Sequence, residues 1–176
     1  WGYAVACMGE ARTLRAHGIK KPILILGCVF PDEYEEMVEK EIRAAVYTEE
    51  MAKGMADAAA RSGKTAFLHI KIDTGMGRIG FKVSKESVET ISRISKLPNI
   101  KMEGMFTHFA KADEFDKSYT FTQHEKFLWM KEQLEKNGVQ ISYYDCDNSA
   151  GIIDFPDMKH DLARAGISIY GMYPSD

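Results

Sequence analysis

The segment Leu68–Phe81 holds the densest group of residues in this sequence that could do chemistry. An apolar stretch that contains Lys71 runs into a glycine-rich turn that contains Asp73, Thr74 and Arg78. Where the strands of a sheet run parallel, ligands bind at their carboxyl ends, because the loops there present polar groups. We therefore expect this turn to form part of a catalytic or binding site.

Three further segments place polar residues beside predicted strands. Thr107–Ala110 and Asp147–Ala150 each follow a strand-like run, and Ala163–Gly166 comes directly before one. The carboxyl ends of parallel strands lie at one edge of a sheet, so these polar groups are expected to converge at one rim.

The glycines of the first segment also satisfy the spacing G-x-G-x-x-G of dinucleotide-binding proteins, through Gly75, Gly77 and Gly80. That fingerprint needs a helix that opens at once and an acidic residue about 20 residues further on. Here the next helix is expected near Ser84, and residues 99–101 are Asn-Ile-Lys. A nicotinamide-binding oxidoreductase is therefore the weakest of the functional hypotheses.

Simpler roles compete with catalysis for several of these residues. Asn148 and Ser149 are typical of a helix N-cap or a turn, and Arg164 of a surface ion pair with Asp161. A lone histidine usually serves packing or the surface, and His108 is kept as a candidate only because of the segment in which it stands. Packing or surface roles are assigned to the other histidines, which are His17, His69, His124 and His160.

Strand-like runs alternate with amphipathic helical stretches along the whole chain, which predicts βα units and a parallel sheet. The helical stretches have apolar residues at i, i+3, i+4 and i+7, and several end near a glycine. The seven predicted strands are Tyr3–Ala6, Ile23–Leu26, Ala44–Tyr47, Ala66–Ile72, Lys101–Thr107, Ile141–Tyr144 and Ile167–Tyr170. Two architectures accommodate them, an open doubly wound sheet or a (β/α)8 barrel that lacks one unit. A complete barrel usually needs about 250 residues, so this chain is too short for one.

Length and composition bound the class of protein. The 176 residues, 45% hydrophobic and 28% charged, fit one globular domain. A net charge of -3 without runs of like charge does not indicate a surface that binds nucleic acid or an anionic membrane. We expect no membrane-spanning helix, no signal peptide before Trp1 and no metal site. The three scattered cysteines, Cys7, Cys28 and Cys146, favour a reducing cytosol.

Four motifs, in their order and spacing, make the sequence resemble bacterial alanine racemase. They are Lys71–Gly80 (KIDTGMGRIG), Gly104–Ala110 (GMFTHFA), Asn148–Ala150 (NSA) and Ala163–Gly171 (ARAGISIYG). The first is nearly specific to that family. The resemblance covers residues 1–176 as one partial cofactor-binding domain. It implies an α/β fold, an incomplete (β/α)8 TIM barrel of about seven strands that lacks the family's first strand and its C-terminal β-domain.

The resemblance implies a cytoplasmic isomerase that interconverts L-alanine and D-alanine with pyridoxal 5′-phosphate (PLP) and supplies D-alanine for the cell wall. It places the cofactor's phosphate against Asn148 and Ser149 and against backbone N–H groups around Gly166 and Ile167. Arg164 faces the pyridine nitrogen. Because a guanidinium stays protonated, it can only donate a hydrogen bond to that nitrogen.

Three catalytic residues follow from the same resemblance. His108 neighbours the cofactor ring, and Arg78 is directed at the cofactor's phenolic oxygen and the substrate carboxylate, a task suited to a planar guanidinium. Lys71 matches a lysine that family members often carry as a carbamate, an anion that orients the arginine. An unmodified lysine would put two like charges at close range. We therefore predict that Lys71 is carbamylated.

The sequence departs from the family pattern in two places. It has Asp145-Cys146-Asp147 where the family usually has His-x-Ala, and Ala165 where the family usually has proline. The two carboxylates could repel a phosphate or point away from it. A serine racemase of related sequence therefore stays open as an alternative.

Two groups that the family's chemistry needs lie outside this sequence. The lysine that carries the cofactor lies upstream of Tyr3 in the family, and a catalytic tyrosine comes from the C-terminal domain of the partner subunit in a homodimer. We expect that the isolated chain does not racemise alanine, and that its unpaired sheet edges favour self-association. The remaining alternatives are another PLP-binding barrel protein, such as an amino-acid decarboxylase or a single-domain PLP carrier, and a non-enzymatic remnant that binds only a cofactor or a partner.

Overall fold

The computed structural model describes residues 1–174, in which parallel strands and helices alternate. The strands are β1 (Tyr3–Val5), β2 (Ile23–Ile25), β3 (Ile42–Val46), β4 (Ala66–Asp73), β5 (Phe81–Lys82), β6 (Ile100–Phe106) and β7 (Tyr143–Asp145). The α-helices are α1 (Met8–Ala16), α2 (Tyr34–Glu39), α3 (Glu49–Ser62), α4 (Lys85–Ile94), α5 (Ser118–Lys136) and α6 (Ser149–Asp154), and the 3-10 helices are η1 (Pro31–Glu33) and η2 (Ile167–Tyr170). Within these residues, no helix combines the length and the apolar character that crossing a bilayer requires.

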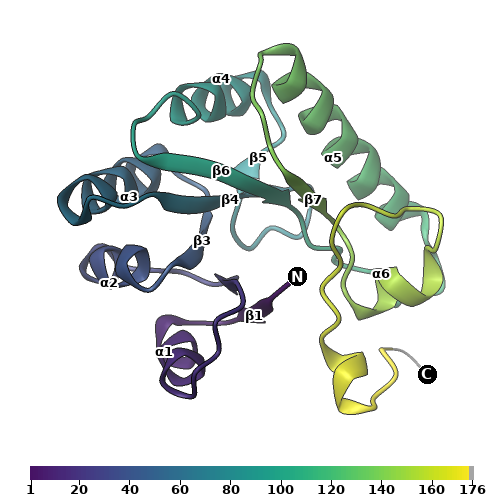
Figure 1. The fold of residues 1–176 in the computed structure, drawn as a ribbon. Coiled ribbons are helices and arrows are strands. Elements are labelled where there is room, and N and C mark those ends of the chain that lie inside the picture. Colours follow the sequence, from purple (N-terminus) through teal and green to yellow (C-terminus); the bar gives the residue numbers. More distant parts are fainter. Residues whose placement is uncertain (175–176) are drawn as a thin grey trace.

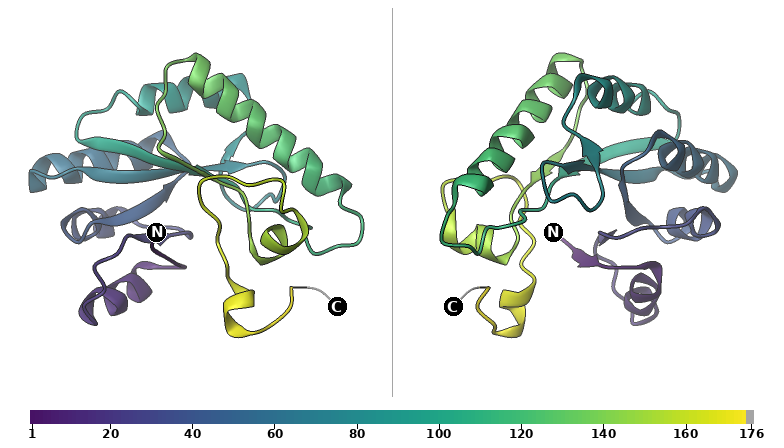
Figure 2. Two further views of the ribbon diagram at one scale, coloured as in Figure 1. Left: turned by 45° about the vertical axis from the view of Figure 1, so that its right-hand side comes forward. Right: turned by 180° about the vertical axis from the view of Figure 1, so that it is seen from behind.

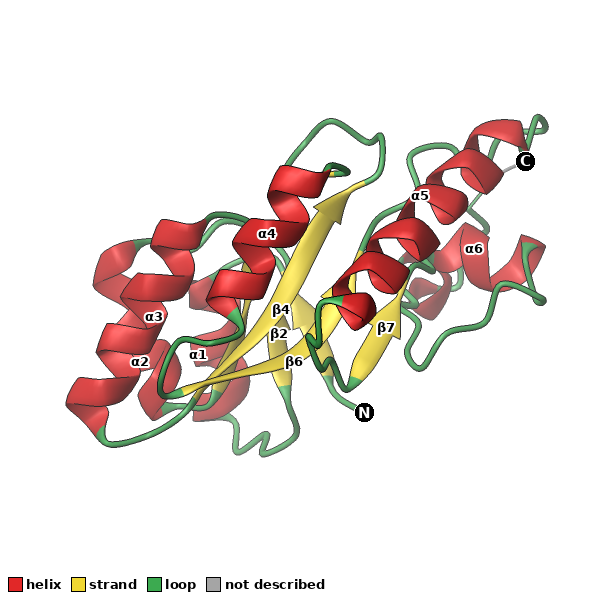
Figure 3. Cartoon of the chain, turned by 90° about the horizontal axis from the view of Figure 1, so that it is seen from above, coloured by secondary structure: helices red, strands yellow, loops and turns green. Residues whose placement is uncertain are grey.

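The strands form one curled sheet in the order β1-β2-β3-β4-β6-β7, with β5 added beside β4. Every pairing is parallel, and the order along the sheet follows the order along the chain. Helices α1 to α5 lie on the outer side of the curl, and β1 and η2 lie at its two ends (Figures 1 and 2). Seen from above, the helices pack over the strands that precede and follow them (Figure 3). The architecture is thus the incomplete (β/α)8 barrel, and not the doubly wound sheet, which carries helices on both faces.

Local sequence signals fix where the helices begin and end. The Thr48 hydroxyl accepts a hydrogen bond of 3.2 Å from the Met51 amide at the start of α3, and Gly63 ends that helix in the left-handed conformation at φ 61°. Ser84 caps α4 in the same way, through the Ser87 amide at 3.1 Å, close to where the sequence predicts a helix start. The apolar stripes of both helices are buried against the sheet.

The strand predicted at Ile167–Tyr170 is wrong. These residues form the 3-10 helix η2, and no strand among the described residues lies beside them to complete a hydrogen-bonded ladder. Backbone groups that lack a ladder partner are satisfied within a local turn instead. The sheet pairing nearest to this segment is a single bridge between Asp145 and Leu162. The side chains of Ile169 and Tyr170 are 71% and 79% exposed, so the apolar pattern that predicted a buried strand is solvated here.

A buried charged cluster joins β3, β4 and β6 on the inner side of the curl. The Glu103 carboxylate accepts hydrogen bonds from Arg43 Nε at 2.9 Å, from Arg43 Nη2 at 3.2 Å and from His69 Nε2 at 3.2 Å. All three side chains are buried, and the Trp1 ring packs on the His69 ring at 5.4 Å between centroids. The packing role predicted for His69 therefore includes a hydrogen bond to the Glu103 carboxylate, within a cluster that joins three strands.

We expect Glu103→Gln to lower the free energy of unfolding by roughly 3 kcal/mol at pH 7, because it leaves the buried Arg43 guanidinium without its counter-ion. Urea denaturation followed by circular dichroism measures this change. The matched control is Glu132→Gln, which removes an exposed carboxylate that Lys136 contacts at 2.7 Å. The control should change stability by less than about 1 kcal/mol.

The comparison of wild type with Glu103→Gln at different pH values tests the ionisation of Glu103. Burial alone raises the pKa of Glu103, but the hydrogen bonds from His69 and Arg43 outweigh it and bring the pKa to about 2. A carboxyl group whose pKa is lowered by folding stabilises the fold above its unfolded pKa of roughly 4.3, and this contribution is lost as the pH falls towards the folded value. The stability difference between wild type and Glu103→Gln should therefore shrink below about pH 4. A difference that stays constant from neutral pH down to the acid limit of folding would contradict this assignment.

Candidate functional site

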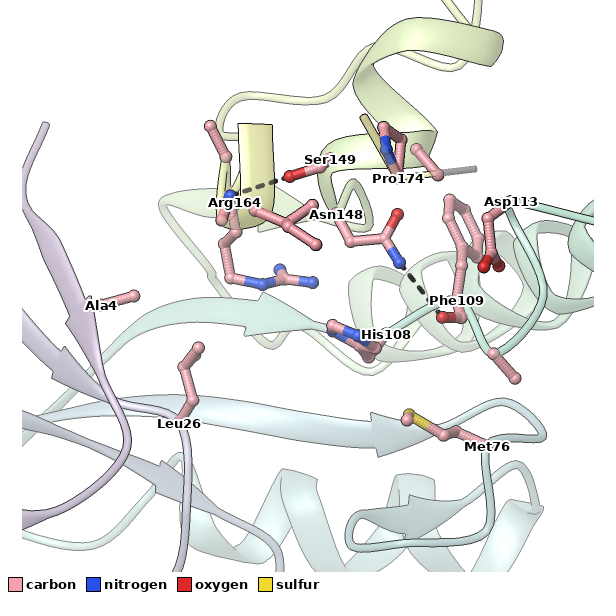
Figure 4. A pocket seen from close by; sticks show the side chains of 15 residues that line it. Ala4, Leu26, Met76, His108, Phe109, Asp113, Asn148, Ser149, Arg164 and Pro174 are labelled. Carbon is pink, nitrogen blue, oxygen red and sulfur yellow. Dashed lines mark hydrogen bonds between the residues drawn. The ribbon is translucent and has the colours of Figure 1, made fainter. Parts of the chain in front are cut away.

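A pocket of about 420 Å³ opens beside the carboxyl ends of the strands, and Figure 4 shows the side chains that line it. Six of the eight residues that the sequence singled out line this pocket, and they come from three segments that are distant in sequence. These residues are His108, Asn148, Ser149, Arg164, Gly166 and Ile167. Leu26, which follows β2, and Ala4 of β1 add apolar surface from the other side of the curl (Figure 4).

Hydrogen-bond donors converge on the Ser149 hydroxyl at the start of α6. Ser149 Oγ accepts from the Gly166 amide at 3.0 Å and from the Ser168 amide at 3.3 Å, and it lies 3.1 Å from Ser168 Oγ. Two backbone N–H groups and two hydroxyls therefore gather at one point of the pocket. Such a set of donors is the arrangement that binds a phosphate group. Ser168 was missed from the sequence, although it lies within the motif that contains Gly166.

Asn148 does what its residue type predicts for a helix N-cap. Its side-chain oxygen accepts a hydrogen bond of 2.9 Å from the Gly151 amide, and its side-chain nitrogen donates to the Phe109 carbonyl at 3.2 Å. Both contacts position α6 relative to the segment that follows β6. The structural role of Asn148 and its place in the pocket lining are thus compatible with each other.

Arg164 is fixed by contacts at both ends of its guanidinium. Nη1 forms an ion pair with Asp145 at the end of β7, and Nη2 donates to the Thr107 carbonyl at 2.7 Å. The surface ion pair with Asp161 is not formed, since the Asp161 carboxylate accepts from the Tyr144 amide at 2.8 Å. The Arg164 side chain is 9% exposed, so its charge is held in the pocket wall (Figure 4).

The two carboxylates that depart from the family pattern do not line the pocket. Burial raises the pKa of Asp145 to about 6, against the opposing effect of Arg164, and burial likewise raises the pKa of Asp147 to about 6. Asp145 is occupied by Arg164, and one oxygen of Asp147 is buried without a hydrogen-bond partner. Of the two possibilities raised by the sequence, the structure favours carboxylates that point away from the phosphate donors.

His108 is uncharged at neutral pH. Burial, followed by the positive charges of Arg164, Arg78 and Lys71 in that order of importance, lowers the pKa of His108 to about 4. A neutral imidazole can donate one hydrogen bond and accept another without adding charge to the pocket. These electrostatic couplings also show that Lys71 and Arg78 lie near His108, although neither lines the pocket.

Lys71 and Arg78 differ in their surroundings. Lys71 lies on β4 and is only 2% exposed, and its Nζ donates to the Ile72 carbonyl at 3.0 Å. Within the described residues, no carboxylate lies within ion-pair distance of it, and burial, followed by the charge of Arg164, lowers the pKa of Lys71 to about 8. Arg78 is exposed in the glycine-rich turn. Lys71 is thus a buried amine poised between its charged and neutral forms.

The glycine spacing is explained by the shape of the turn. Asp73 Oδ1 accepts from the amides of Gly75 and Gly77 at 3.1 and 2.9 Å, and Tyr119 Oη donates to the Gly75 carbonyl at 2.7 Å. Gly80 has φ 137°, and a Cβ there would lie 2.5 Å from the Asp73 nitrogen. The turn continues into β5, and α4 begins only after it, so the helix that a dinucleotide fingerprint needs is absent. Tyr119 was missed from the sequence because it lies on α5, far from the turn along the chain.

Comparisons with known proteins agree with one another. The sequence model of a family described as alanine racemase, N-terminal domain, matches residues 1–174. Alanine racemase from Clostridium tetani is 47% identical over 172 residues, which are 98% of this chain and 44% of that protein, and that from Methanococcus maripaludis is 47% identical over 98% of this chain and 46% of its own. A solved alanine racemase from Clostridium difficile superposes with a TM-score of 0.97 at 44% identity, over 99% of this chain and 46% of that one. The chain thus spans less than half the length of the relatives it matches.

We expect Arg164→Gln to raise the pKa of His108, because the largest positive charge that acts on that imidazole is removed while its burial remains. Nuclear magnetic resonance titration of the imidazole signals measures the shift. The internal control is His160, whose pKa is lowered to about 4 by burial, His124 and Lys131 and not by Arg164. An unchanged His108 pKa, or an equal shift of both histidines, would contradict the arrangement described here.

Proposed function

Because the chain belongs to the alanine racemase family, whose N-terminal domain it matches, we propose that it forms the cofactor-binding part of an enzyme that interconverts L-alanine and D-alanine. The observation that carries this proposal is the convergence of four donors at Ser149 beside the fixed guanidinium of Arg164, in one pocket. The residues of that pocket fit PLP, since a phosphate needs several donors at one point and an aromatic ring needs apolar walls.

Each part of the pocket has a task in holding the cofactor. Ser149, together with the amides of Gly166 and Ser168, would bind the phosphate, and Gly166 allows close approach because it has no side chain. Arg164 would face the pyridine nitrogen and keep it unprotonated, because the guanidinium can only donate a proton in a hydrogen bond. His108 would lie beside the ring in its neutral form. PLP, when bound, supplies an electron sink for the electrons left on the substrate when its Cα–H bond breaks.

We propose that Lys71 acts as an anion that orients Arg78 towards the substrate carboxylate. The neutral amine attacks the carbon of carbon dioxide, an N–C bond forms and one proton leaves to solvent, so that a carbamate replaces the ammonium. The pKa of about 8, lowered first by burial and then by Arg164, leaves roughly one tenth of the amine neutral at pH 7, far more than an exposed lysine would have. The carbamate would also supply the negative charge that this buried, cationic part of the site lacks.

The oligomeric state, location and substrate that we propose are those implied by the family. We propose a homodimer in the cytoplasm, with alanine as the substrate and cell-wall precursors as the destination of D-alanine. Asp145 and Asp147 do not line the pocket, so this departure from the family pattern gives no reason to prefer serine.

The first test is a spectroscopic titration of the purified chain with PLP. We expect saturable binding that inorganic phosphate reverses, with no specific lysine adduct after borohydride reduction and no racemisation of alanine by the chain alone. Ser149→Ala should weaken binding by roughly ten- to a hundredfold, as expected for the loss of a hydrogen bond to a charged group. Ser95→Ala is the matched control, because Ser95 bonds only within the end of α4. Saturable binding of NADH in place of PLP, or no binding of PLP at all, would overturn the proposal.

Carbamylation of Lys71 has its own test. In bicarbonate buffer, native mass spectrometry should show the chain heavier by one carbon dioxide, and ¹³C-labelled bicarbonate should give a carbamate carbonyl signal. Both signals should disappear in Lys71→Arg and persist in Lys64→Arg, which changes an exposed lysine bonded to the Glu39 carbonyl. An unmodified mass for the wild type under these conditions would refute the modification.

A further inference from the structure

A second group of reactive side chains lies outside the pocket, between α5 and the end of β7. His124 belongs to α5, Cys146 directly follows β7, and His160 lies in the loop after α6. One potential ligand atom from each, a ring nitrogen or the sulfur, lies within 4.8 Å of the others, and the two Nε2 atoms are 3.0 Å apart. Sequence analysis predicts packing or surface roles for both histidines and no metal site.

The surrounding side chains hold this group in place. The His160 ring packs edge-on against Phe127 with 5.4 Å between centroids, and its centroid lies 5.2 Å from that of His124. Phe127 is fully buried, and so is Cys146, whereas the two histidines are half-buried. The sulfur thus forms the base of the group, and the imidazoles connect it with solvent.

We propose that His124, Cys146 and His160 bind one zinc ion or a similar divalent transition metal through two ring nitrogens and a thiolate. Zinc takes nitrogen at roughly 2.0–2.1 Å and thiolate sulfur at roughly 2.3 Å in tetrahedral geometry. Two nitrogens bound to one zinc ion are then roughly 3.3 Å apart, and a nitrogen and a sulfur roughly 3.6 Å. The two nitrogens are 3.0 Å apart here and all three atoms lie within 4.8 Å of one another, so side-chain rotations would bring them to these separations. Soft sulfur with two imidazoles selects such ions over Mg²⁺ or Ca²⁺.

The electrostatics of the group are compatible with a dication. Burial lowers the pKa of both histidines, which keeps the rings in the neutral form that coordinates metal. Burial also raises the pKa of the Cys146 thiol, with the charges of Asp145 and Asp147 as the next causes. When the ion binds, a sulfur lone pair forms the bond to the metal and the thiol proton leaves to solvent. The charges of Asp145 and Asp147 attract a dication, and those of Arg164 and Lys71, which also act on Cys146, oppose it.

The proposed ion would act as a structural clamp. It would join α5 to β7 and to the loop between α6 and η2, which carries Arg164 and Gly166. A metal that binds only the folded chain raises its thermal stability by mass action. This role is independent of PLP, so it can fail or succeed apart from the proposed enzymatic function.

Titration of the reduced, metal-free chain with Co²⁺ tests the site, because a cobalt–thiolate bond gives a charge-transfer band in the near ultraviolet. We expect one equivalent to bind, Zn²⁺ to displace it, and Zn²⁺ to raise the midpoint of thermal unfolding. Cys146→Ser should abolish the band, and His160→Gln should weaken binding by at least about 100-fold. Cys28→Ser is the matched control, because it removes an exposed thiol elsewhere and should leave the band unchanged.

X-ray absorption of the zinc-loaded wild type gives a result that needs no variant. One sulfur and two imidazole nitrogens around the ion would support the site even if Cys146→Ser fails to fold. Three results would overturn the proposal: a coordination shell without sulfur, a cobalt band that survives Cys146→Ser, or metal binding no tighter than that of a single exposed histidine such as His17. In that case the two histidines form only a half-buried N–H···N hydrogen bond above a packed thiol.

Discussion

The ion pair between Arg164 and Asp145 holds the loop between α6 and η2 against the carboxyl end of β7, and the candidate site depends on it. Backbone hydrogen bonds from Leu162 to the Tyr144 carbonyl and from Arg164 to the Asp147 carbonyl also hold this loop to β7 and the residues after it. The guanidinium contacts to Asp145 and the Thr107 carbonyl add a side-chain anchor inside the curl. Because Arg164 fixes the position of this loop, the amides of Gly166 and Ser168 lie within hydrogen-bond distance of the Ser149 hydroxyl. A buried pair of this kind contributes little net stability, yet breaking it is costly because one charge stays buried. Its value here is that it determines where the loop lies.

The second constraint on the site is its excess of positive charge. Lys71, Arg78 and Arg164 all act on His108 and keep that imidazole neutral, while Asp145 balances only one of them. Such a field suits ligands that carry a phosphate and a carboxylate, since both are anionic at neutral pH. Burial is the main reason that the pKa of the Lys71 amine is lowered, and the positive charge of Arg164 adds to it. A group that turned Lys71 into an anion would offset part of this positive charge.

Much of this arrangement could be predicted from the sequence, because it is local. The helices follow from apolar stripes and from caps such as Thr48 and Ser84, and the polar residues at strand ends follow from the rule that parallel strands bring their carboxyl ends to one edge. The prediction failed at Ile167–Tyr170, because an apolar run does not reveal whether a neighbouring strand is present to pair with it. It also missed Tyr119 and the partner of Arg164, since contacts between distant segments leave no trace in local patterns. The resemblance to alanine racemase supplied what local patterns could not, namely which of the converging polar residues belong together.

The tripeptide Asp145-Cys146-Asp147 shows how one short segment can serve two environments. Successive side chains at a strand end point to opposite faces, so Asp145 reaches Arg164 on the inner side while Cys146 lies between β7 and α5 beside the two histidines. On the inner face, the departure from the family pattern adds the carboxylate that fixes Arg164. On the outer face, Cys146 occupies the position that the family pattern leaves variable, and its sulfur lies beside the histidine pair. Both contacts act on the loop that carries Gly166. A substitution in this tripeptide is therefore expected to shift the amides that would bind the phosphate, even though none of its side chains lines the pocket.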